Sequence, residues 1–171
     1  PAAEWTWRCL RRGGPKLLVA EGSARVVLAN LKAGELVGYV LDQHTPPGRA
    51  VWVPFFGRPA ATCPGLARLA ELSQAPVVPV FTWRNADGRH QIWIEPPVAL
   101  CREGDRNARL VENTARFAAR VEAATRRRPD QWLWIHRRWK RPPDDVQAEL
   151  DRSGRCGRRR TIASASPSSA D

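Results

Sequence analysis

Several polar side chains in this sequence are of the types that hold anions or orient substrates. Asp42 and Gln43 follow the apolar run 35–41, where a carboxylate can orient a cation or a substrate hydroxyl, or simply cap a turn. Arg58 and Thr62 precede a predicted helix, whose first backbone N–H groups attract anions. Arg84 stands at the carboxyl end of a predicted strand, which is where layered α/β sheets bind their ligands.

The segment 136–141 (HRRWKR) places five cationic or titratable side chains in six residues. Arginine grips phosphate oxygens through two N–H groups and lysine acts as a point charge, so the segment is a candidate phosphate clamp. Its candidate residues are His136, Arg137, Arg138 and Lys140. A solvated basic terminus is one alternative, and a nucleic-acid interface with Trp139 stacking on a base is another. No helix-turn-helix, RNP or KH signature supports nucleic acid.

His90 and Glu95 have the HX4E spacing of a general base and its orienting carboxylate. Because side chains alternate along a strand, residues five positions apart lie on opposite faces, and we expect no catalytic dyad. The sequence also contains no GxSxG elbow and no Walker loop. Its four cysteines show no CxxC spacing, which predicts neither a zinc site nor a disulfide framework. We therefore predict no metal and no cofactor.

The net charge of +11 has a definite location along the 171 residues. The segment 142–171 carries five arginines and five acids, so the whole excess lies in residues 1–141. A folded basic surface attracts nucleic acid, anionic lipid headgroups or an acidic carrier protein. No apolar run reaches the roughly 20 residues that cross a bilayer. The eight tryptophans are mostly expected to pack in the core.

Apolar periodicity and turn signals predict strands that alternate with helices, which is the pattern of a layered α/β fold. Asp105 is expected to cap the longest helix. The strands 35–41 and 77–83 read as buried on both faces, and 85–88 as a hairpin turn. Predicted helices cover 2–12, 24–32, 64–73, 106–125 and 130–138, and predicted strands cover 16–20, 35–41, 50–56, 77–83 and 90–95.

Four sequence blocks in this order resemble one family. They are VGYVLDQ, VWVPFFGRPAAT, GLARLAELSQAPVVPVFTWR and PDQWLWIHRRWKRP, and together they are similar to the bacterial lipid A biosynthesis acyltransferases of the lauroyl and myristoyl branch. The resemblance implies a lysophospholipid acyltransferase-like α/β fold with a mixed central sheet flanked by helices. It also implies that residues 1–141 are the C-terminal part of the acyltransferase domain, incomplete at the N-terminus. We expect 142–171 to be a mostly disordered tail.

The same resemblance implies transfer of a fatty acyl chain from acyl carrier protein to a hydroxyl of a lipid A precursor or similar phosphoglycolipid. The expected location is the cytoplasmic face of the bacterial inner membrane, in contact with its surface. The family's HX4D/E base is expected upstream of Pro1, so we expect the chain to be inactive alone. Asp42 matches the family's acidic DQ position near the acceptor, and Arg84 becomes a candidate phosphate contact. The alternative is a basic module that binds nucleic acid or anionic lipid without catalysis; a catalytically dead scaffold is a third possibility.

Overall fold

The computed structural model describes residues 22–140, 142, 144 and 146–148. Contacts divide the chain into two compact units between Val37 and Gly38. In the first unit, helix α2 (Ala24–Lys32) has the predicted bounds, and Val27 is its buried residue. The predicted helix 2–12, the predicted strand 16–20 and the segment 149–171 lie outside the described residues.

The hairpin of β1 (Val51–Phe55) and β2 (Arg58–Thr62) forms the centre of the second unit. The strands are antiparallel, and the two-residue turn between them has positive φ at both positions, 52° at Phe56 and 72° at Gly57. Such a turn matches the right-handed twist of a hairpin, but a bulky residue rarely occupies its first position. Phe56 is therefore an unusual choice, and its contacts are described below.

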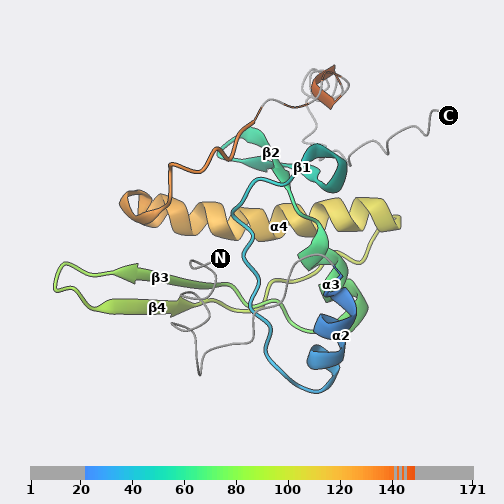
Figure 1. The fold of residues 1–171 in the computed structure, drawn as a ribbon, viewed down its shortest axis with the longest axis horizontal. Coiled ribbons are helices and arrows are strands. Elements are labelled where there is room, and N and C mark those ends of the chain that lie inside the picture. The colour runs from blue at the N-terminus through green and yellow to red at the C-terminus, as the bar shows by residue number, and fades with distance from the viewer. Residues whose placement is uncertain (1–21, 141, 143, 145, 149–171) are drawn as a thin grey trace, which may run out of the picture. The chain divides into compact units, whose positions relative to one another are not determined.

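Strand β1 is buried on both faces. Val51 and Val53 pack against Val111 and Ala118 of helix α4 (Arg106–Arg127), which crosses below the hairpin in Figure 1. The opposite face presents Trp52, which forms a second cluster of buried residues with Ala50, Ala61 and Val146. Because Val146 belongs to this core, the packed part of the chain continues beyond the predicted boundary at residue 142.

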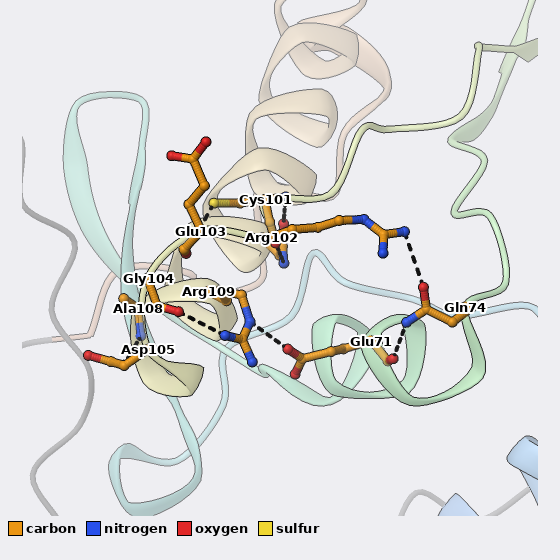
Figure 2. A network of polar contacts seen from close by, with 10 residues as sticks. Glu71, Gln74, Cys101, Arg102, Glu103, Gly104, Asp105, Ala108 and Arg109 are labelled. Carbon is orange, nitrogen blue, oxygen red and sulfur yellow. Dashed lines mark hydrogen bonds and ion pairs between the residues drawn. The ribbon is translucent and has the colours of Figure 1, made fainter.

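Helix α4 begins as predicted and is fixed at its start by polar contacts (Figure 2). The carboxylate of Asp105 accepts a hydrogen bond from the Ala108 amide at 2.9 Å, which confirms the predicted cap. Arg109 pairs with Glu71 of helix α3 (Gly65–Ser73) at 2.7 Å. Within the described ranges, neither α4 nor any other helix combines the length and apolarity needed to cross a bilayer.

The second hairpin consists of β3 (Val80–Arg84) and β4 (His90–Ile94), joined by the predicted turn. The prediction that 77–83 is buried on both faces is wrong, because exposed and half-buried side chains alternate along β3. This sheet has two strands, and one of its faces is open: Val80 is 57% and Ile94 is 67% exposed. The hairpin extends on the other side of α4 from β1 and β2 (Figure 1).

The mixed α/β class is confirmed, but two of the predicted elements are not formed. The run 35–41 is not a strand, because no described strand pairs with it, and Leu36 and Val40 are exposed. The predicted helix 130–138 is reduced to the 3-10 turn η2 (Pro129–Gln131), and the chain then runs on in extended and turn conformations. In place of one mixed central sheet, the described residues form two separate antiparallel hairpins.

Candidate functional site

The guanidinium of Arg138 is the centre of the most buried polar arrangement among the described residues. Arg138 is 1% exposed. Its Nη1 donates to the carbonyl oxygens of Gln43 at 3.1 Å and Ala61 at 2.5 Å, and its Nη2 donates to Thr62 Oγ1 at 2.5 Å. The hydroxyl of Thr62 in turn donates to the Ala60 carbonyl at 3.0 Å. Three predicted site residues, Gln43, Thr62 and Arg138, are thus brought together from three distant segments.

The charged guanidinium of Arg138 is hydrogen-bonded to uncharged oxygens. Burial lowers the pKa of Arg138 to about 10, and the nearby negative charge of Asp42 opposes this shift. The side chain therefore remains a cation at neutral pH. Its Nε is buried without a hydrogen-bond partner, and its Cζ lies 5.4 Å from the centroid of the Phe55 ring. Asp42 thus acts on Arg138 through its field, and the acceptors fix the orientation of the guanidinium.

Two histidines that are far apart in the sequence also belong to this group. The backbone amide of His44 donates to His136 Nε2 at 2.7 Å, so this nitrogen carries no proton in the structure. Burial lowers the pKa of His44, and the positive charges of Lys140 and Arg138 lower it further. His44 was not among the predicted site residues, although its position directly after Asp42 and Gln43 was a usable signal. We call the set formed by Asp42, Gln43, His44, Thr62, His136 and Arg138 the Arg138 cluster.

The remaining predicted residues lie around this cluster or away from it. The guanidinium of Arg58 lies 5.5 Å from the Trp139 ring, whose Nε1 donates to the Phe55 carbonyl at 3.1 Å. Arg137 and Lys140 are exposed. Arg84 is at the end of β3, where its Nε donates to the Gly88 carbonyl at 3.2 Å. The structure therefore places Arg84 at the hairpin turn and not beside Arg138.

Two details of the predicted anion sites need correction. Thr62 precedes helix α3, as predicted, but its side chain does not cap the helix: Thr62 belongs to β2, and the capping position is Pro64, which has no side-chain donor or acceptor. The Thr62 hydroxyl is already used by Arg138 and Ala60, so it is not available to an anion beside Arg58. Two of the three guanidinium nitrogens of Arg138 likewise donate hydrogen bonds to the protein itself. Among the described residues 136–140 of the basic segment, the exposed cations are Arg137 and Lys140.

Glu95 has partners other than His90. Its Oε2 lies 2.5 Å from Arg120 Nη2, and its Oε1 lies 4.0 Å from Arg127 Nη1. The carboxylate is almost fully buried under these two arginines of α4, whereas His90 is exposed at the far end of β4. The expectation that this HX4E spacing forms no dyad agrees with these contacts. Glu95 instead fastens the hairpin β3–β4 to α4.

The arrangement can hold a chain segment in place and attract anions. The Arg138 cluster fixes the segment that follows η2 against β2, and this leaves Arg137 and Lys140 at the surface beside it. Such exposed cations can bind phosphate oxygens. Within the part of the chain that the structure describes, no group of three His, Cys, Asp or Glu side chains is placed to hold a metal ion.

Comparison with known proteins gives a consistent result. A family model described as bacterial lipid A biosynthesis acyltransferase matches residues 1–141. A lipid A biosynthesis lauroyltransferase of Escherichia coli is 33% identical over 151 residues, covering 85% of this chain and 47% of that protein. A lipid A biosynthesis acyltransferase of Haemophilus influenzae is 31% identical over 137 residues, or 79% and 41% of the two chains. The chain thus spans less than half the length of these relatives.

Proposed function

The chain belongs to the bacterial lipid A biosynthesis acyltransferase family, and from this premise we propose that it is part of an enzyme that acylates a lipid A precursor. The observation that carries the proposal is the family match over residues 1–141. Related proteins named for lauroyl and palmitoleoyl transfer, at 33% and 30% identity, point in the same direction. The acyl donor is acyl carrier protein, and the reaction takes place at the cytoplasmic face of the inner membrane.

The chemistry needs a base that removes the proton from the acceptor hydroxyl. The hydroxyl oxygen then attacks the thioester carbonyl, and the thiol of the carrier leaves with a proton. We assign the base to an HX4D/E motif outside this chain, which makes the chain inactive by itself. The described residues contribute the acceptor side of the site.

Arg137 and Lys140 are our candidates for binding the phosphates of the acceptor. Both are exposed, and both belong to a segment that the buried side chain of Arg138 holds in place. A charged group on a fixed segment loses less conformational freedom on binding than one on a free loop. Asp42 is the supporting residue, because its charge favours the charged form of Arg138.

The decisive experiment joins this chain to a segment that carries HX4D/E and measures acyl transfer from acyl carrier protein to a lipid A precursor. We expect transfer by the joined protein and none by the chain alone. Replacing Arg137 and Lys140 by alanine should raise KM for the acceptor about tenfold, because each lost phosphate contact weakens binding by about 1 kcal/mol or less.

The matched control replaces Arg68 and Arg106, two exposed arginines on α3 and α4, by alanine. This control changes the net charge equally and should leave KM unchanged. Equal effects of the two pairs would show that only overall charge matters, and a joined protein without acyl transfer would overturn the proposed activity.

A further inference from the structure

Three consecutive apolar side chains project from the surface directly after η2. Leu133 is 67%, Trp134 is 51% and Ile135 is 84% exposed. Single exposed apolar residues are ordinary on protein surfaces, whereas a contiguous group marks a site of contact. We call residues 133–135 the apolar loop.

The apolar loop is held at both of its ends. Before it, the side-chain amide of Gln131 accepts from the Arg84 N–H at 2.7 Å and donates to the Arg84 carbonyl at 2.8 Å. Within it, Trp134 Nε1 donates to the Pro129 carbonyl at 2.5 Å. After it, the buried Arg138 is bound to β2. The loop is thus fixed in a conformation that presents Leu133 and Ile135 to solvent.

The unusual turn residue Phe56 packs against the apolar loop and so stabilises this conformation. Its ring lies 6.2 Å from the Trp134 ring and 4.7 Å from Arg126 Cζ, measured to ring centroids. Its backbone N–H donates to Glu122 Oε2 at 2.5 Å. A phenylalanine at positive φ costs more than the usual asparagine or glycine, and these contacts offset that cost.

The side chains beside the apolar loop include more cations than carboxylates. Exposed Arg137 and Lys140 follow the loop, and the half-exposed guanidinium of Arg126 lies over the Phe56 ring. The adjacent Glu122 is mostly buried and pairs with Arg126. Asp130 is the exposed carboxylate beside the loop. The charged side chains beside the apolar loop, which we call its rim, therefore carry a net positive charge.

We propose that the apolar loop docks this protein on a bilayer that contains anionic phospholipids. Leu133, Trp134 and Ile135 enter the interfacial region, and the surrounding arginines and lysine bind the headgroups. Tryptophan favours the boundary between headgroups and hydrocarbon, and basic side chains near an anionic bilayer add attraction that salt screens. This inference names the membrane contact of the function proposed above, and it rests on that function only for the choice of compartment.

The test measures co-sedimentation of the 171-residue chain with vesicles of phosphatidylcholine alone and with about 30 mol% phosphatidylglycerol, the anionic lipid that the rim cations require. We expect binding to the anionic vesicles, with a large loss at about 0.5 M salt because the headgroup attraction is screened. The double variant L133S/I135S should bind about tenfold more weakly, since it removes two apolar side chains from the interface. The variant I135W should bind more tightly.

The matched control is V80S/I94S on the open face of β3–β4, where the two side chains are similarly exposed. It should bind as the unchanged chain does, and circular dichroism should show that all variants keep their fold. The proposal is overturned if the chain binds neither vesicle, if L133S/I135S binds normally, or if the control loses as much binding. If L133S/I135S instead converts a dimer into a monomer without affecting vesicle binding, the apolar loop is an interface between copies. None of these measurements requires acyl transfer, so their failure leaves the proposed reaction untouched.

Discussion

The hairpins β1–β2 and β3–β4 are both built from two five-residue antiparallel strands, and they have opposite surroundings. The side chains of β1 are buried on both faces by α4 and by the cluster around Trp52 and Val146. The apolar side chains on one face of β3–β4 remain open to solvent. Strand composition alone does not explain this contrast: VFTWR contains Thr82 and Arg84 where VWVPF is apolar throughout, but Val80 of β3 and Ile94 of β4 are apolar and are still exposed. The contrast comes from the segments that reach each hairpin from elsewhere in the chain.

The largest expected effect is a difference in stability between variants that remove a tryptophan from each hairpin. Trp52→Ala should lower the free energy of unfolding by about 3–5 kcal/mol, because it opens a large cavity in a packed cluster. Trp93→Ala should cost about 1 kcal/mol, since Trp93 is half-exposed on β4. Urea denaturation of the two variants measures the difference. Similar losses would contradict the view that only the first hairpin is core.

The next effect concerns the two arginines that contact the hairpins. Arg138→Ala should cost about 3 kcal/mol, because it leaves the buried Thr62 Oγ1 and the Gln43 carbonyl without this donor and removes one of two donors from the Ala61 carbonyl. Arg84→Ala should change stability by less than about 0.5 kcal/mol, since its guanidinium is exposed. Thermal and urea unfolding of both variants check this order. A loss below about 1 kcal/mol for Arg138→Ala would mean that the cluster does not anchor the basic segment.

The two turns should respond alike. Gly57 has φ of 72° and Gly88 has φ of 84°, values that alanine adopts with strain. A Cβ would meet nothing within 4 Å at Gly57, and only the mobile guanidinium of Arg84 at Gly88. Each alanine substitution should therefore cost about 1 kcal/mol from backbone strain alone. A much larger loss at Gly57 would show that the buried hairpin tolerates less adjustment of its turn.

The smallest effect is a pH dependence that belongs to the first hairpin. Burial and the cations Lys140 and Arg138 depress the pKa of folded His44 below its unfolded value of about 6.5. The unfolded chain therefore takes up the proton first, so stability is complete above about pH 6.5 and declines as the pH falls below it. Asp42, two positions before His44, is the nearest carboxylate in the sequence. Urea unfolding at about pH 5 and pH 7.5 should show a smaller decline for His44→Gln than for the unchanged chain. Equal declines would show that His44 does not cause the pH dependence of stability.

Local signals predicted helices α2, α3 and α4 and the second turn well. The bounds of α2, the start of α4 and the cap at Asp105 all follow from side chains within a few positions of one another. The turn 85–88 was predicted from its Asp-Gly pair, which depends on backbone conformation alone.

Burial and the centre of the candidate site were less predictable, because they depend on distant segments. Periodicity shows that a strand is apolar but not whether another element covers it, so 35–41 and 77–83 were assigned a burial they do not have. Arg138 has the composition of a surface residue, and it is buried because Ala61 and Thr62, more than 70 positions away, supply its acceptors. The functional roles of Asp42, Arg84, Arg137 and Lys140 stay predictions.

The contact between Gln131 and β3 has a further consequence for how this protein behaves at high concentration. The N–H and carbonyl of Arg84 are both occupied by a single side-chain amide, which imitates the backbone of a neighbouring strand. An open strand edge invites pairing with the strand of another molecule and so begins aggregation. Gln131 closes this edge at the end of β3, so a foreign strand must first displace the amide before it can extend the sheet. By occupying these two groups, Gln131 opposes strand-to-strand association at this end of β3, in addition to holding the apolar loop.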